Sequence, residues 1–253
     1  MKQRVFLITP VLNEVENLPN LTQSWKNLSI ELSEFEFHFI LVDDGSNDNT
    51  GIVAQELSKD LNFILLSHTK NKGPGYAFGT GFEYLAPIIT KNDMVVTIEG
   101  DNTSRMETLS IMLGRIIREN VDVTFASPYA YGGGFHNTSF IRVLISHFGT
   151  AITKTFLGIH GIQTFSSFFR AYKGEVIITL QKRYGARILE FDGFECMIEL
   201  LQKLIIMQFS ISEVAMKLDT SLRKGKSKMK VVKTALSYFS VYNTSKKWRN
   251  KNT

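Results

Sequence analysis

Residues 95–104 read VVTIEGDNTS, an apolar and β-branched run that leads directly into two carboxylates. The run predicts a buried strand. Glu99 and Asp101 follow it, with only Gly100 between them. Carboxylates at the edge of a core are costly unless a partner compensates them. Because residues i and i+2 of a strand point the same way, these two could share one hard cation, Mg²⁺ or Mn²⁺.

The same arrangement recurs through the N-terminal half, where strand-like and helix-like segments alternate. Apolar strands are predicted at residues 4–9, 37–42, 62–67, 94–98 and 121–127. Helices are predicted at residues 14–32 and 51–61, after the glycine-rich stretch 70–81 as far as residue 89, and at 107–120. This alternation predicts an α/β fold with a mainly parallel central sheet and helices on both faces.

Polar clusters follow three of these strands. They read TPVLNE, DDGS and EGD. Sheets of this kind bind ligands at the carboxyl ends of their strands. We therefore expect the three clusters to lie along one edge of the sheet and to form the functional site.

Composition sets the class of protein. The chain has 253 residues, of which 43% are hydrophobic, as is typical of a globular protein. The single Cys196 cannot form an internal disulfide, which favours a reducing compartment, and a buried core position is its expected role. We find no signal peptide and no apolar run of about eighteen residues. These features predict a cytoplasmic protein without a membrane-spanning helix.

Basic residues are concentrated in the last third of the chain. Residues 223–233 read RKGKSKMKVVK and residues 246–253 read KKWRNKNT. Such segments suit phosphate groups, an acidic membrane surface or nucleic acid, or form a solvated basic face. Nucleic acid is disfavoured because the interleaved aromatics of a base-stacking platform are missing. Residues 236–248 mix aromatics with Lys, as in an interfacial segment or an ordinary surface helix.

Two further stretches carry binding chemistry. Asp43 and Asp44 follow a strand and could accept hydrogen bonds from a base or a ribose, or simply form a turn. Residues 70–81, KNKGPGYAFGTG, could cradle a phosphate at the start of a helix. They lack the Gly-Lys-Ser/Thr ending of a P-loop.

Taken together, the segments TPVLNE, VDDGSNDNT, NKGPGYAFGTGF and EGDNTS resemble the motifs of the inverting nucleotide-sugar glycosyltransferases of family 2, which have a GT-A fold. Order and spacing match over roughly residues 4–232. SFIRVLISHFG, FSSFFRAYKGEVI, GFECMIELLQKL and RKGKSKMK are similar to segments of dolichyl-phosphate mannose synthases and bacterial polyprenyl-phosphate glycosyltransferases. The resemblance implies one GT-A domain over residues 1–232 and a basic, aromatic tail over 233–253.

The resemblance also assigns roles to individual residues. Contacts with the nucleotide sugar are implied for Pro10, Leu12, Glu14, Val42, Asp44, Gly73 and Gly100. Metal binding is implied for Asp101, with Glu99 beside it and Thr103 as a further polar ligand. Contacts with an acceptor phosphate are implied for Arg142, Ser146, Arg223, Ser227 and Lys228. The catalytic set is then Asp101, Glu99, Arg142 and Arg223.

Several positions depart from the family pattern, among them Leu12, Glu99, Pro128 and Phe168. Leu12 replaces a Tyr, which weakens base stacking, and Glu99 replaces an Asp, which keeps the charge but lengthens the reach. Pro128 replaces an Arg and removes one phosphate contact, and Phe168 replaces a Gly. These changes bear on the sugar and the acceptor more than on the fold.

The implied reaction transfers a hexose from a GDP- or UDP-sugar with inversion, while the cation neutralises the leaving diphosphate. A polyprenyl phosphate acceptor is already ionised and needs no general base. A lipid acceptor of this kind would place the protein at the cytoplasmic face of a membrane, through peripheral contact or a membrane partner protein.

Two alternatives to this reaction stay open. A sugar acceptor would need a carboxylate base, for which Glu195 is a candidate, and a binder of nucleotide sugars would show no turnover.

Overall fold

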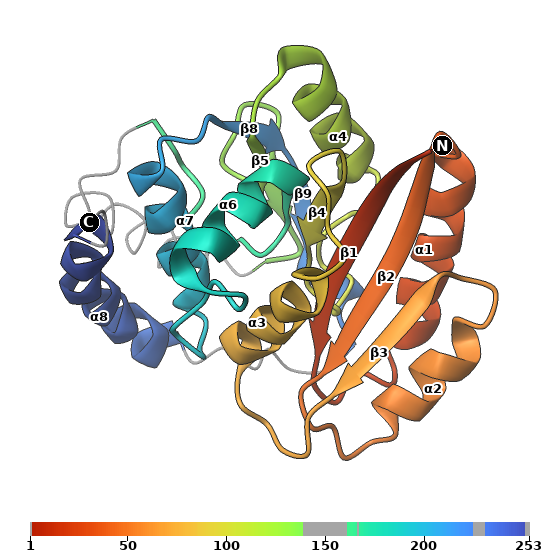
Figure 1. Cartoon of the computed structure of the whole chain (residues 1–253). Helices are drawn as coiled ribbons and strands as arrows, with labels where there is room; N and C mark the ends of the chain where they lie inside the picture. The colour runs from red at the N-terminus through yellow and green to blue at the C-terminus, as the bar shows by residue number, and fades with distance from the viewer. Residues whose placement is uncertain (1, 139–160, 166, 225–230, 251–253) are drawn as a thin grey trace.

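The computed structural model describes residues 2–138, 161–165, 167–224 and 231–250, without the side chains of 231–236, 239 and 250 (Figure 1). Four residues with predicted phosphate contacts lie outside the described residues: Arg142, Ser146, Ser227 and Lys228.

A seven-stranded sheet in the order β3-β2-β1-β4-β7-β5-β8 forms the centre of the molecule (Figure 1). Its strands are β1 (Gln3–Val11), β2 (Phe35–Asp43), β3 (Phe63–Ser67), β4 (Met94–Thr97), β5 (Val123–Ser127), β7 (Arg170–Lys173) and β8 (Ile211–Ala215). Neighbouring strands pair in parallel except β7, which runs antiparallel to both β4 and β5. The prediction of a mainly parallel sheet is confirmed. A second, two-stranded sheet pairs β6 (Gly134–His136) with β9 (Lys217–Asp219).

Helices cover both faces of the sheet. One face carries α1 (Leu18–Glu31), α2 (Thr50–Leu57) and α4 (Thr108–Glu119), and the other carries α3 (Pro74–Leu85), α6 (Gly174–Tyr184) and α7 (Cys196–Ile206). Successive strand residues point to opposite faces. Leu7 therefore packs in the α1 core while Ile8 packs in the α3 core. Both faces are buried, which explains why the strands are continuous apolar runs.

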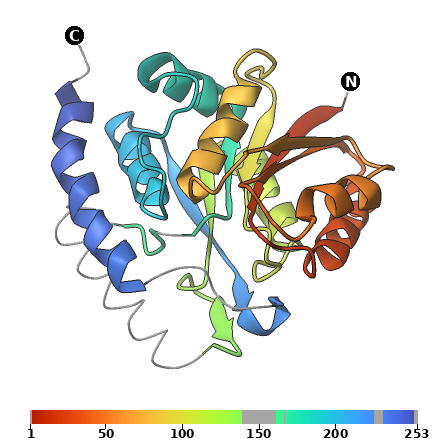
Figure 2. The ribbon, with the colours of Figure 1, turned by 90° about the horizontal axis from the view of Figure 1, so that it is seen from below.

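The last helix, α8 (Val231–Asn250), lies alongside α7 on the side of the molecule far from α1 and α2 (Figure 2). Trp248 is fully buried, and its indole N–H donates to Glu190 over 2.8 Å. The interfacial interpretation of residues 236–248 is therefore wrong for this side chain, which belongs to the core. Tyr242, Lys246 and Lys247 face solvent. No helix in the described part of the chain is long and apolar enough to cross a membrane.

A buried ion pair lies within α7 and joins Glu199 of its first turn to Lys203 of its last turn. Lys203 donates to Glu199 over 2.5 Å and to the Ile188 carbonyl over 2.6 Å, and neither charged side chain is exposed. Burial raises the pKa of Glu199, although the Lys203 charge opposes the shift. Burial also raises the pKa of the Cys196 thiol well above its ordinary value, in keeping with the core role expected for it.

Candidate active site

The ends of β2, β1 and β4 meet at one edge of the sheet, since these strands are neighbours in its order. Their loops are hydrogen-bonded to one another. The Asp44 N–H donates to the Val11 carbonyl over 2.9 Å, and the Asn13 N–H donates to the Ser46 hydroxyl over 2.8 Å. The expectation that the three polar clusters share one edge is confirmed.

The two carboxylates after β4 do not follow strand geometry. The strand ends at Thr97, two residues before Glu99, so strand alternation was the wrong argument for a shared direction. One oxygen of Glu99 accepts from the Ser104 hydroxyl over 2.9 Å, and the other lies 3.4 Å from the Phe168 N–H. Burial raises the pKa of Glu99, and the charge of Asp101 raises it further.

Asp101 has different partners. Its Oδ1 accepts from the N–H and the hydroxyl of Thr103, over 3.1 and 2.7 Å. Its Oδ2 accepts from the Arg223 Nε over 2.6 Å, and a second guanidinium nitrogen pairs with the same oxygen. The Asp101 and Arg223 side chains are only 14% and 21% exposed. Two residues 122 positions apart, expected at the metal and at a phosphate, are thus in direct contact.

The glycine between the carboxylates has a steric reason. A Cβ on Gly100 would lie 2.5 Å from the Val11 side chain and 3.2 Å from the Pro10 carbonyl oxygen. The loop that carries Glu99 and Asp101 therefore lies directly on the end of β1. This contact places the backbone between the two carboxylates beside Pro10, where the nucleotide is expected. Leu12, in the loop after β1, is half-buried.

Asp44 is held by the loop that follows β3. Its carboxylate accepts from His68 Nδ1 over 2.7 Å, from the Lys72 N–H over 3.0 Å and from the Gly73 N–H over 2.7 Å. It therefore positions the glycine-rich segment against β2. Val42 is fully buried in the α3 core, so only its backbone could reach a ligand.

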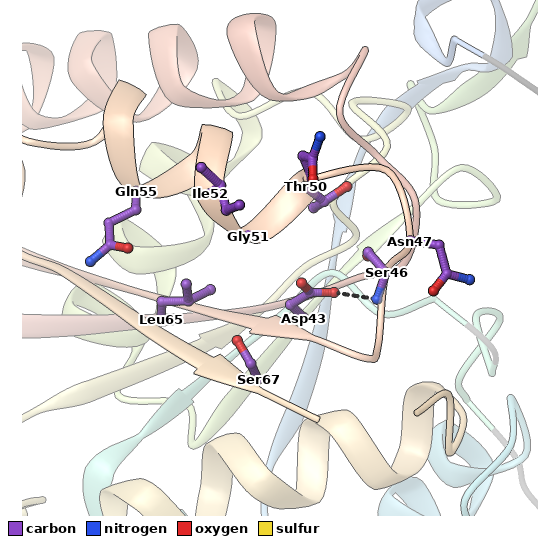
Figure 3. Close-up of a pocket in the computed structure, with 10 residues that line it drawn as sticks. Asp43, Ser46, Asn47, Thr50, Gly51, Ile52, Gln55, Leu65 and Ser67 are labelled. Carbon is purple, nitrogen blue, oxygen red and sulfur yellow. Dashed lines mark hydrogen bonds between the residues drawn. The ribbon is translucent and has the colours of Figure 1, made fainter. Parts of the chain in front are cut away.

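Asp43 points the other way, toward α2 (Figure 3). It accepts from the Ser46 N–H over 2.9 Å. It lines a shallow pocket between α2 and the end of β3, together with residues such as Thr50, Gln55 and Ser67 (Figure 3). None of the lining residues belongs to the loop of Asp101. Of the two carboxylates in the DDGS cluster, Asp43 therefore belongs to a separate pocket.

The N–H groups of the glycine-rich segment already have acceptors within the protein. The N–H groups of Gly75 and Tyr76, in the first turn of α3, donate to the Asp192 carbonyl over 2.8 and 3.3 Å. Those of Lys72 and Gly73 are taken by Asp44, as described above. The interpretation of residues 70–81 as a phosphate cradle is therefore wrong for these donors.

Two residues near the site were missed by sequence reasoning. Arg170 is fully buried and donates to the carbonyls of Phe165, Ser167 and Met197 over 2.6, 2.9 and 2.9 Å. It thereby orders the loop whose Phe168 N–H faces Glu99. An Arg in an apolar strand was the available signal. The other missed residue is Asn17, whose contacts cross from α1 to the Arg223 segment.

The donor set suits a divalent cation that also binds substrate. Within the described parts of the chain, no group of three or more His, Cys, Asp or Glu side chains comes together. Mg²⁺ in nucleotide sites takes only one or two carboxylates and completes its shell with phosphate oxygens and water. Asp101, beside Glu99 and Thr103, fits this requirement. The Arg223 guanidinium already places one cationic group on Asp101.

Known proteins with similar sequences are transferases. The family model for glycosyl transferase family 2 matches residues 6–179, more than half of the chain. The chain is 29% identical to the polyprenol monophosphomannose synthase of Mycolicibacterium smegmatis, over 90% of this chain and 81% of that one. It is 29% identical to the dolichol-phosphate mannosyltransferase of Pyrococcus furiosus, over 79% of this chain but only 53% of that one.

Solved structures agree on the fold. The mannosyltransferase PcManGT from Pyrobaculum calidifontis, in complex with GDP-Man and Mn²⁺, aligns with a TM-score of 0.55 at 16% identity, over 99% of this chain and 73% of that one. S. aureus TarS 1–349 in complex with UDP aligns with a TM-score of 0.61 at 18% identity, over 96% of this chain and 66% of that one. The family match and the shared fold agree with the geometry at the sheet edge. The chain therefore belongs to glycosyl transferase family 2 and is a glycosyltransferase with a GT-A fold.

Proposed function

We propose that this glycosyltransferase moves a hexose from a nucleotide diphosphate sugar to a polyprenyl phosphate, with inversion at the anomeric carbon. One observation carries the proposal. Asp101 and Arg223 meet at the carboxyl edge of the sheet, so the carboxylate proposed to bind the metal and the guanidinium proposed to bind phosphate share one site. The relatives named for polyprenol and dolichol phosphates support the choice of acceptor, and their mannose makes GDP-mannose the first donor to test.

In the proposed reaction the bond between C1 of the hexose and the donor phosphate oxygen breaks, and its electron pair leaves with the nucleoside diphosphate. A new bond forms between C1 and an oxygen of the acceptor phosphate. That oxygen is already ionised near neutral pH, so no proton has to be removed. Arg223 would transfer its hydrogen bonds from Asp101 to a phosphate and would hold two anions close together.

Asp101, with Glu99 and Thr103 beside it, would hold Mg²⁺ or Mn²⁺. The bound ion would supply neutralisation of the charge that grows on the leaving diphosphate. We propose that the nucleotide lies over the end of β1, against Pro10, Leu12 and Glu14. Gly100 lets the loop of Glu99 and Asp101 pack closely on the end of β1, and Asp44 keeps the neighbouring loop in place.

A sugar hydroxyl acceptor is the second candidate, and it would require a general base. Glu195 was the candidate base. Its carboxylate accepts from the Ser237 hydroxyl of α8 over 3.1 Å, at the start of α7. This contact supports a role in docking α8. It favours the phosphate acceptor, which needs no base.

We further propose that residues 1–232 form the catalytic domain and that the outward face of α8 meets an acidic membrane surface. That face carries exposed Lys246, Lys247 and Arg249 beside Tyr242, and residues 231–250 contain no acidic side chain. Trp248 contributes by docking the helix, not by entering lipid. A peripheral position of this kind would bring the site close to a lipid-linked phosphate.

Product analysis tests the proposal. The protein is incubated with Mn²⁺, radiolabelled GDP-mannose and a short polyprenyl phosphate, or with a soluble mannoside in place of the lipid. The proposal expects label in an acid-labile lipid product with β configuration, and none in the soluble acceptor. Transfer to the mannoside alone would overturn it in favour of the second candidate.

A further inference from the structure

Asn17 precedes the first turn of α1 but does not cap it. An Asn at this position ordinarily accepts a hydrogen bond from an N–H of its own helix. Asn17 makes no such bond, although it is 99% buried. Pro19 explains part of this, because it removes one of the N–H groups that a cap would satisfy. The Leu18 N–H is taken by the Glu14 carbonyl over 3.2 Å.

The side-chain amide of Asn17 is used instead on a segment 207 residues away. Its Oδ1 accepts from the Lys224 N–H over 2.9 Å, and its Nδ2 donates to the Lys224 carbonyl over 3.1 Å. This two-point contact holds the backbone of one residue in the manner of a sheet pair. The residue it holds is the neighbour of Arg223, which pairs with Asp101.

The same asparagine also contacts the two loops of the candidate site. Its Nδ2 donates to a Glu14 carboxylate oxygen over 2.5 Å, in the loop after β1. The main-chain carbonyl of Asn17 accepts from Asn102 Nδ2, in the loop of Asp101, over 2.9 Å. Asn102 has a positive φ of 62°, which an Asn tolerates. Asn17 thus joins the loop after β1, the loop of Asp101 and the Arg223 segment.

We propose that Asn17 is a positioning residue that fastens the Arg223–Lys224 segment over the donor site. The fastening keeps Arg223 within reach of the reacting phosphates when its contact with Asp101 gives way to the cation. This inference rests on the proposed function for its catalytic consequence. The fastening itself concerns contacts that can be measured without any substrate.

Limited digestion with trypsin measures the fastening directly, because the Arg223–Lys224 bond is a trypsin site. Cleavage there requires local opening of the segment. Asn17→Ala should speed cleavage after Arg223 by about tenfold, as expected for the loss of one or two hydrogen bonds. Asn20→Ala, an exposed change in the same turn, is the matched control and should cleave as wild type does. Equal cleavage in all three proteins would overturn the inference.

Kinetics then separate positioning from general stability. Asn17→Ala should lower kcat for sugar transfer about tenfold with a smaller change in the donor KM. Lys224→Pro removes the same N–H, and Arg223 already has the extended backbone (φ −72°, ψ 127°) that a following proline requires. Measured against Lys224→Ala, it should lower kcat by a similar factor. The losses of kcat in Asn17→Ala and Lys224→Pro should not add when both changes are combined in one variant.

The outcomes distinguish the two proposals. Faster cleavage in Asn17→Ala, with no turnover of any donor by the wild type, would leave the fastening standing and remove the proposed function. Unchanged cleavage with normal wild-type turnover would remove the fastening alone. Additive losses in Asn17→Ala and Lys224→Pro would also contradict it, since the two changes would then act at different places.

Discussion

The contact between Arg223 and Asp101 makes an unusual prediction about metal binding. Arg223→Met removes the guanidinium but keeps a side chain of similar length. In the wild type, Nε donates to Asp101 Oδ2 over 2.6 Å, and a second guanidinium nitrogen reaches the same oxygen. A divalent cation must displace this pair before it can use that oxygen. The variant should therefore bind Mn²⁺ more tightly in the absence of donor.

The size of the effect follows from the pair. A hydrogen bond to a charged group contributes roughly 1.5–3 kcal/mol. The two side chains are 14% and 21% exposed, so solvent screens part of this and about 1–2 kcal/mol remains. Because 1.4 kcal/mol corresponds to a factor of ten, the Kd for Mn²⁺ should fall by about 5- to 30-fold.

Electron paramagnetic resonance of free Mn²⁺ measures this Kd without donor or acceptor. Arg105→Met is the matched control, because it removes the same charge close to the same loop. Arg105 pairs with Asp219 over 3.4 Å and is 48% exposed. Only Arg223→Met should show the full gain in affinity for Mn²⁺. Its rate of sugar transfer should nevertheless fall, because the guanidinium is lost. Weaker Mn²⁺ binding in Arg223→Met, or an equal gain in both variants, would refute the reasoning.

Three further predictions concern the nucleotide, the core and pH. Leu12→Tyr should tighten binding of the nucleoside diphosphate about fivefold or more, measured by calorimetry, because an aromatic ring can stack on the base; unchanged affinity would place the base elsewhere. Lys203→Met should lower the free energy of unfolding in urea by about 3–5 kcal/mol, because Glu199 would stay buried without its cation; a loss under 1 kcal/mol would contradict this. Hydrogen bonds, first of all from Asn137, lower the pKa of Asp219 from 3.8 to about 2. The stability that Asp219→Asn removes should therefore be present in full above pH 3.8 and lost as pH falls toward about 2, and a pH-independent difference in unfolding would exclude this source.

The sheet could be predicted because its strands are buried on both faces. Continuous apolar runs such as residues 37–42 end abruptly in polar clusters, and parallel neighbours bring those clusters to one edge. The insertion of β7 between β4 and β5, antiparallel to both, could not be predicted. Nothing in RAYK specifies its partners, since pairing over such distances is set by the packing of the whole sheet.

The sequence predicted polar clusters at one edge of the sheet, but it could not predict the directions of their side chains. Asp101 and Arg223 were identified separately, but their pairing depends on a fold that joins positions 122 residues apart. The directions of Glu99 and Asp101 are set by a turn that begins after Thr97, for which strand periodicity carries no information. Asn17 was missed because its partner Lys224 lies 207 residues away, which no local pattern indicates. Composition indicated either an interfacial segment or an ordinary surface helix for residues 236–248, whereas the burial of Trp248 depends on the docking of α8.

Release of nucleoside diphosphate tests the central claim most directly. The purified protein and its Asp101→Ala variant are mixed with Mn²⁺ or Mg²⁺ and each common nucleotide sugar in turn, with and without a short polyprenyl phosphate. The account predicts release from one donor that requires the lipid phosphate and is lost in Asp101→Ala. Release that does not need the lipid, or that survives in Asp101→Ala, would contradict it.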